Sequence, residues 1–168
     1  SKISADFGGG ELLDNGYWYN GRNAVYRYKG YLLINGYDPR ALKDILPSED
    51  QGGVGTENVH FEEGTYSGQP AYRYNYNKPN TEWVIYPAFP KELSTGFVDY
   101  DNYLSNMTIA TFEDQGAIVN YNTQYVSHDM PMQDINPNLK ISSSEIVSIF
   151  TELKNNNIGI VNYLPDIS

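Results

Sequence analysis

The chain contains no cysteine, which excludes disulfide bonds and any mechanism that uses a thiol nucleophile. Histidine is nearly as scarce, since His60 and His128 are the two copies in 168 residues. Any site that needs an imidazole base or ligand must therefore be built around one of these two side chains.

Basic residues and long apolar runs are also few. Eleven lysines and arginines stand against 21 acidic residues, and the net charge is −10. Nucleic acid is therefore not an expected partner, because affinity for phosphate backbones comes from basic side chains that release counterions. No segment approaches the roughly 20 apolar residues that cross a bilayer as a helix, so no membrane span is expected. Residues 1–10 show no secretion-signal pattern.

Tyrosine is the residue type in excess, with 16 copies, and aromatic residues make up 14% of the chain. Rings that carry a hydroxyl suit sheets with one wetted face better than a purely apolar helical core. The length fits one domain over residues 1–168. Neutral polar loops and a charged fraction of 19% favour a protein that is extracellular, at the cell surface or in a virus particle.

One phrase occurs twice, as YNGRNAVYRY at 19–28 and as YSGQPAYRY at 66–74. Each copy alternates in a period of two, which predicts a β-strand, and Lys29-Gly30 supplies a tight turn after the first. A short strand opens each copy as well. We therefore expect two three-stranded meanders, an internal quasi-repeat over 16–37 and 64–86.

Three further elements follow from local signals. High β-propensity on both sides of Asp114-Gln115-Gly116, in residues 107–113 and 117–126, predicts a third hairpin. Asp38 before Pro39 predicts the start of a short helix. A capping box at residues 142–145, followed by apolar residues at helical spacing, predicts a C-terminal amphipathic helix. The expected fold class is mainly β to α+β: antiparallel meanders or a small sandwich, with this helix packed on the sheet.

A face of tyrosines on such a sheet is a candidate binding surface, because tyrosine offers a rigid ring and a hydroxyl at low entropic cost. Its expected partner is a glycan or a protein surface. A competing interpretation places the same rings in the core, on the buried face of an antiparallel sheet, and the alternation fits both. The candidate residues are Trp18, Tyr19, Tyr26, Arg27, Tyr28, Tyr72, Arg73, Tyr74 and Trp83.

The phrase Tyr-Asn-Gly-Arg followed by an aromatic strand resembles short Tyr/Gly hairpin repeats of secreted and phage structural proteins. The second copy departs from that pattern, with Gln69-Pro70 in place of Arg22-Asn23. The resemblance implies a modular, non-catalytic surface protein. A second hypothesis is a structural subunit of a pilus, fibre or phage particle, in which homo-oligomers or assembly contacts form.

Metal sites have weaker support. His60 and Glu62 lie on one face of a predicted strand, a spacing that suits a divalent ion with a third ligand from elsewhere. Asp99, Asp101 and Asn102 space oxygen ligands as the opening of a calcium loop does, but the glycine and the distal glutamate of that loop are missing. Calcium is thus a minor hypothesis, and no other cofactor is expected.

A third functional hypothesis is a hydrolase that uses His60 or His128 with an acidic partner. Ser127-His128-Asp129 has the residue types of a catalytic triad, but neighbours in sequence point apart and need the fold to bring partners together. Nothing in the spacing of the acidic residues selects a catalytic pair. Asn106-Met107-Thr108 also matches the acceptor pattern for N-glycosylation.

Overall fold

A computed structural model describes residues 11–13, 16–49, 56, 60–62, 65–66, 69–70, 73–75, 84–96, 102–122, 126–127 and 141–156. These residues form the α-helices α2 (Arg22–Ile34), α3 (Asn106–Asp114) and α4 (Ser143–Asn155), together with one short 3-10 helix, η1 (Pro39–Ala41). Helix is the main regular structure of this part of the chain. The expectation of a sheet-based fold, either mainly β or α+β with a small sandwich, is therefore wrong.

The strands in the described residues are only two to four residues long. The largest sheet is antiparallel, in the order β1 (Glu11–Leu13), β2 (Gly16–Tyr19), β3 (Leu46–Pro47). Three separate pairs complete the set: β4 (Thr65–Tyr66) with β5 (Gln69–Pro70), β6 (Arg73–Asn75) with β7 (Val84–Tyr86), and, in parallel, β8 (Leu104–Ser105) with β9 (Val126–Ser127). Pairs of this size have too little buried face to stand without the helices.

The first copy of the repeated phrase forms helix α2 and not the predicted hairpin. Ala24, Tyr28 and Leu32 recur every four residues and are all buried on one face of the helix. The sequence of this segment therefore fits a helical period as well as a period of two. The turn predicted at Lys29-Gly30 lies inside this helix. No local start signal marks α2, because its N-cap residue is Gly21, which has no side chain to form a cap.

The second copy forms the predicted strand pair, in which β6 and β7 run antiparallel with Tyr74 opposite Ile85. The Tyr-Arg-Tyr motif therefore lies in a helix in the first copy, whereas Arg73 and Tyr74 of the second copy lie in a strand. Helix and strand propensities of such residues differ by less than about 1 kcal/mol each. Tertiary packing is enough to reverse a preference of that size.

The third predicted hairpin is also wrong, because residues 106–114 form helix α3. The β-branched residues between 108 and 111 suggested a strand. In the helix, Met107 and Ala110 are fully buried three residues apart and pack into the core around α2. The N-cap of α3 is Ser105, whose hydroxyl accepts a backbone N–H of the first turn.

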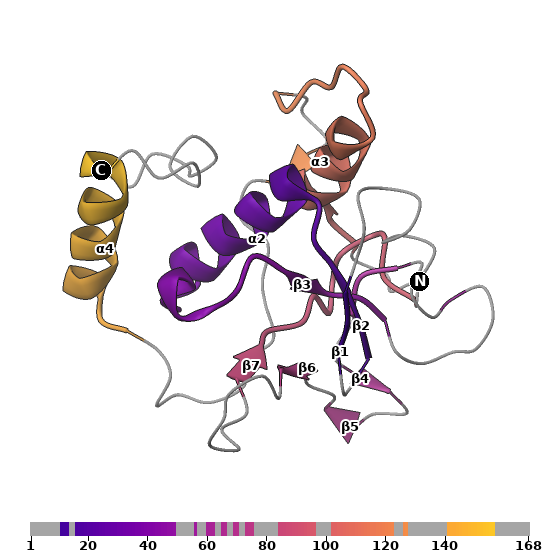
Figure 1. Cartoon of the computed structure of the whole chain (residues 1–168), viewed down its shortest axis with the longest axis horizontal. Helices are drawn as coiled ribbons and strands as arrows, with labels where there is room; N and C mark the ends of the chain where they lie inside the picture. The colour runs from indigo at the N-terminus through magenta and orange to yellow at the C-terminus, as the bar shows by residue number, and fades with distance from the viewer. Residues whose placement is uncertain are drawn as a thin grey trace.

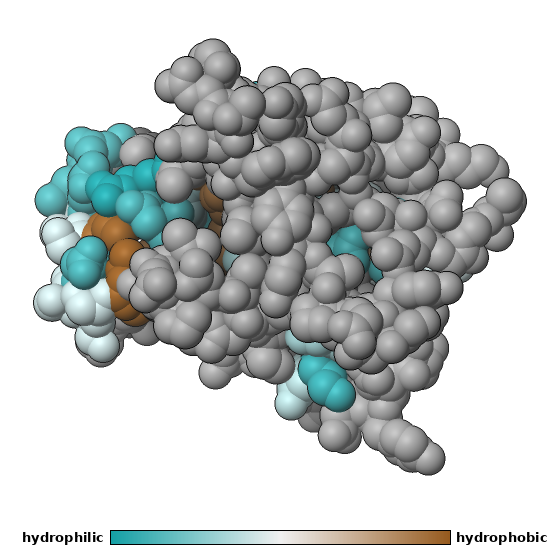
Figure 2. Space-filling model, turned by 90° about the horizontal axis from the view of Figure 1, so that it is seen from below, coloured by the Kyte–Doolittle hydropathy of each residue, from teal (hydrophilic) through white to brown (hydrophobic). Residues whose placement is uncertain are grey.

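Helix α4 forms where the capping box predicts it. Ser142 is its N-cap, and the Ser142 hydroxyl and the Glu145 side chain make both reciprocal capping bonds. Ile149 and Leu153 are buried against Leu33 of α2. Figure 1 shows α4 beside one end of α2 and apart from α3. At this end of the molecule hydrophobic residues lie next to hydrophilic ones on the surface (Figure 2).

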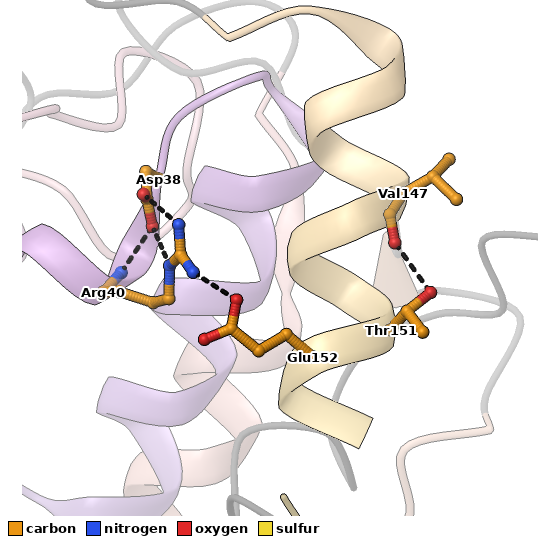
Figure 3. A network of polar contacts seen from close by, with 5 residues as sticks. All are labelled: Asp38, Arg40, Val147, Thr151 and Glu152. Carbon is orange, nitrogen blue, oxygen red and sulfur yellow. Dashed lines mark hydrogen bonds and ion pairs between the residues drawn. The ribbon is translucent and has the colours of Figure 1, made fainter. Parts of the chain in front are cut away.

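A surface ion network makes a second contact between α4 and the rest of the chain (Figure 3). Arg40 of η1 pairs with Asp38 at 2.9 Å and with Glu152 of α4 at 2.5 Å. Asp38 is also the N-cap of η1, as predicted. Hydrogen bonds from Arg40 hold the pKa of Asp38 below its ordinary value. Because these side chains are partly exposed, such pairs contribute at most about 1 kcal/mol.

The core is centred on α2, which lies between α3 and α4 with the sheet β1-β2-β3 beside it (Figure 1). Residues 28–33 of α2 are all buried. Trp18 and Tyr86 meet edge to face with ring centroids 4.7 Å apart, and Tyr28 and Phe89 do so at 5.1 Å. Ring pairs of this kind add about 0.5–1.5 kcal/mol each beyond the area that they bury.

Candidate functional site

Three of the predicted binding residues belong to the core. Trp18, Tyr19 and Tyr28 are at most 1% exposed and pack in the main hydrophobic cluster. The buried-face interpretation therefore describes these three rings better than the binding interpretation does. The three rings do not share one sheet face, however, because Tyr28 lies in α2 and Trp18 and Tyr19 are successive residues of β2.

The remaining candidates differ in how far the structure describes them. Tyr26 and Arg27 are half-buried on α2. Arg73 and Tyr74 lie in β6, where the backbone alone is described, and Tyr72 and Trp83 lie outside the described residues. Among the predicted binding residues, Tyr26 and Arg27 are thus the two that the structure places at the surface.

Hydroxyl groups of buried tyrosines connect elements that are distant in sequence. The Tyr28 hydroxyl donates to the carbonyl oxygen of Pro87 at 2.8 Å, and the Tyr31 hydroxyl accepts the backbone N–H of Asn106 at 2.9 Å. Burial raises the pKa of Tyr28 well above its ordinary value, so this hydroxyl keeps its proton. Each ring fills the core while its hydroxyl satisfies a buried backbone group, which explains part of the tyrosine excess.

A narrow stripe in the first turns of α2 reaches the surface, although most of this helix is buried. Arg22 lies over the ring of Tyr26, with its Cζ 5.4 Å from the ring centroid. Arg27 lies over the ring of Tyr121, which follows α3, at 3.9 Å. Such cation–π contacts are worth about 0.5–1 kcal/mol at exposed positions. We name these four residues the arginine–tyrosine stripe.

Glu113 of α3 fixes one ring of this stripe. The Tyr121 hydroxyl donates a hydrogen bond to the Glu113 carboxylate. Burial, followed by this bond and the charge of Glu113, raises the pKa of Tyr121, although Arg27 opposes the shift. The Tyr121 ring is therefore neutral at physiological pH, and Arg22 and Arg27 supply the positive charge of the stripe.

Asp114, the last residue of α3, positions the start of α2. Its Oδ1 accepts the Asn23 N–H at 2.8 Å, and its Oδ2 accepts the Ala24 N–H at 3.2 Å and the Tyr19 hydroxyl at 2.9 Å. Asp114 thus caps α2 across 90 positions of sequence, in place of the side chain that Gly21 lacks. A Cβ on Gly21 would lie 2.2 Å from the Tyr19 hydroxyl oxygen, so this cap requires glycine.

A fully buried carboxylate, Glu92, lies at the other end of α3. It accepts hydrogen bonds from the backbone N–H groups of Ser94 and Ser105 and from the hydroxyls of Ser105 and Thr108. Burial raises the pKa of Glu92, while these hydrogen bonds oppose the shift. Because Glu92 is 0% exposed, a substrate has no access to it. These hydrogen bonds anchor the N-terminus of α3 to the Glu92 side chain.

His60 and Glu62 do not form a metal site with other described residues. His60 Nδ1 lies 3.1 Å from the carbonyl oxygen of Thr56, and Glu62 is buried. Within the described ranges, no three histidine, aspartate or glutamate side chains are grouped to hold a metal ion. No described carboxylate makes an ion pair with His60 either. This histidine therefore has no described partner for hydrolysis.

Most of the other predicted site residues lie outside the described part of the chain. Asp99, Asp101 and His128 are not among the described residues, and Asn102 is half-buried. Asn106 is 6% exposed at the start of α3. The folded chain has no room for a bulky glycan on so buried an amide, so the structure does not support this acceptor pattern as a glycosylation site.

Reasoning from sequence missed Arg22, Tyr121 and Asp114. The spacing of Arg22 and Tyr26, four residues apart, is a helical signal, but the strand assignment concealed it. Asp114 carries no local signal, because the groups that it binds lie 90 to 95 positions away.

Comparison of the chain with protein-family models, with curated proteins and with solved structures finds no match. None of the described helices is both long enough and apolar enough to cross a membrane.

Proposed function

We propose that this chain is a non-catalytic interaction protein that contacts a protein partner through the arginine–tyrosine stripe. The observation that carries the proposal is the pair of cation–π contacts, Arg22 over Tyr26 and Arg27 over Tyr121, at the surface of a strongly acidic chain. Arginine and tyrosine are enriched among the residues that dominate protein interfaces. An extracellular, cell-surface or virus-particle location belongs to the same proposal and rests on composition alone.

The arrangement of the rings favours a protein over a glycan as the partner. A sugar stacks on an open ring face, but each surface ring of the stripe has a guanidinium over one face. Tyr26 also packs against both hydrophobic clusters, which occupies more of its ring. The guanidinium of Arg22 is exposed, and its N–H groups suit the carboxylate and carbonyl acceptors of a polypeptide.

A pre-organised stripe is also a low-cost binding surface. Stacking restricts the long side chains of Arg22 and Arg27 before any partner arrives. Ordering such a side chain at an interface costs about 0.5–1.5 kcal/mol, and a side chain that is already ordered avoids most of that cost.

The test uses wild-type protein and three single variants as immobilised baits for extracts and culture supernatants of the source organism, followed by affinity measurement on each purified partner. Arg22→Ala and Tyr26→Ala should weaken binding by about tenfold or more, as expected for a central interface residue. Arg40→Ala is the matched control, because it removes one positive charge at an exposed site outside the stripe.

Equal affinity of all four proteins for every partner would show that the stripe is not the binding surface. Binding to neutral glycans on an array, with the same loss in Tyr26→Ala, would replace the protein partner by a sugar. Circular dichroism of each variant checks that α2 remains folded.

A further inference from the structure

Two described Asn–Gly pairs, Asn20–Gly21 and Asn35–Gly36, flank helix α2. Asparagine before glycine is open to spontaneous deamidation, because a glycine nitrogen has no neighbouring Cβ to hinder its attack on the asparagine side chain. The glycine nitrogen loses its proton to a base in solution and bonds to the asparagine Cγ. The Cγ–Nδ2 bond then breaks as Nδ2 takes up a proton from the solution, and ammonia leaves. Water then opens the resulting cyclic imide to give aspartate or isoaspartate.

Asn35 is held away from this reaction by the end of α2. Its side-chain Nδ2 donates to the carbonyl oxygen of Tyr31 at 2.8 Å. The attacking nitrogen, that of Gly36, donates its own hydrogen to the carbonyl oxygen of Leu33 at 3.0 Å, and Gly36 is fixed at φ +85°. Both reacting groups must therefore break hydrogen bonds before they can meet.

Asn20 has neither restraint. It is exposed and lies alone between the end of β2 and Gly21, the N-cap of α2. Within the described part of the chain, neither the Asn20 side chain nor the Gly21 N–H makes a hydrogen bond. The same dipeptide thus occurs at both ends of one helix, once with hydrogen bonds on both reacting groups and once with none.

We infer that Asn20 is a site of spontaneous deamidation in the folded protein and that the fold protects Asn35. Isoaspartate at position 20 would insert an extra atom into the backbone beside Gly21. The space there is full, because even a Cβ on Gly21 would lie 2.3 Å from Asp114 Oδ2. The modification therefore displaces the cap that Asp114 makes on α2, and either product adds a negative charge two residues from Arg22.

The experiment incubates the folded protein in mildly alkaline buffer and follows each Asn–Gly peptide by mass spectrometry, with isoaspartate resolved from aspartate by fragmentation. Peptides that contain Asn20 should deamidate faster than those that contain Asn35 by on the order of tenfold or more, since two hydrogen bonds restrain Asn35 alone. An Asn20→Gln variant should lose the signal at position 20 without altering the rate at Asn35.

The same incubation in concentrated urea separates the effect of the fold from that of the sequence. Unfolded chain should deamidate at the two positions at similar rates, and folding should slow Asn35 much more than Asn20. Equal rates at both positions in the folded protein, or a rate at Asn20 that folding suppresses as strongly as at Asn35, would overturn the inference.

Discussion

Several single residues of this chain have structural roles that cannot be inferred from their neighbours in sequence. Gly21 begins α2 without positive φ, since its φ is −59°, and it is needed because no side chain fits between the Tyr19 hydroxyl and Asp114. Tyr28 and Tyr31 act as core residues that also carry one polar bond each. At the residue scale, the excess of tyrosine is partly a way to fill the core without leaving backbone groups unsatisfied.

Asp114→Ala tests the cap that joins α3 to α2. The variant leaves two backbone N–H groups of α2 and the Tyr19 hydroxyl without their acceptor, so the free energy of unfolding should fall by about 1–3 kcal/mol. Urea denaturation measures this loss. Asp114→Asn retains one acceptor oxygen and should lose less. An Ala variant as stable as wild type would show that water replaces the carboxylate without cost.

The pH dependence of stability tests the buried carboxylate of Glu92. Burial raises its pKa in the folded state above that in the unfolded chain, so the folded protein binds more protons between the two values. The contribution of this group is therefore fully present below the ordinary glutamate pKa and is lost as pH rises through the raised value.

Denaturation of wild type and Glu92→Gln over a pH series isolates this contribution, because glutamine does not titrate. The stability of wild type relative to the variant should decrease as pH rises from the ordinary glutamate pKa upward. An increase over that interval would mean that the hydrogen bonds from Ser94, Ser105 and Thr108 outweigh desolvation.

At the scale of elements, α4 is attached by two contacts of different strength. Ile149 and Leu153 bury apolar surface against Leu33, whereas Glu152 reaches Arg40 in the exposed network of Figure 3. A buried leucine is worth about 2 kcal/mol or more when cut to alanine, and an exposed ion pair at most about 1 kcal/mol. The apolar contact should therefore dominate.

Hydrogen exchange of α4 amides distinguishes the two contacts. Leu153→Ala should increase exchange throughout α4, because the helix loses its packing on α2 and opens locally. Glu152→Ala should leave exchange nearly unchanged, with any small loss reduced further by salt. The reverse order of effects would place the main attachment in the ion network.

For the described part of the molecule as a whole, one buried helix organises the rest. The central position of α2 joins α3, the strands β1-β2-β3 and α4 to one another (Figure 1). The arginine–tyrosine stripe lies at the surface of the first turns of α2 and includes Tyr121, which follows α3. The chain has a net charge of −10, but at physiological salt charges more than about 8 Å away are screened, so the charges close to the stripe dominate recognition there.

Sequence alone determined those elements whose signals are local. The capping box at Ser142 lies within the segment that it starts, and the pairing of β6 with β7 needs only a loop between two alternating runs. Asp38 likewise caps η1 from the position just before it. Tyr26 and Arg27 of the stripe are also among the binding residues predicted from the repeated phrase, although as part of a strand.

Only the tertiary structure decided the state of the two segments that form α2 and α3. Their residues satisfy a period of two and a helical period at once, and the differences in propensity are small. Asp114 caps α2 across 90 positions and Glu92 anchors α3 from outside it, so each helix is held by a side chain from elsewhere in the chain. Partners so distant leave no pattern in a short window of sequence. The packing of α2 against α3 therefore decides that both segments form helices and not strands.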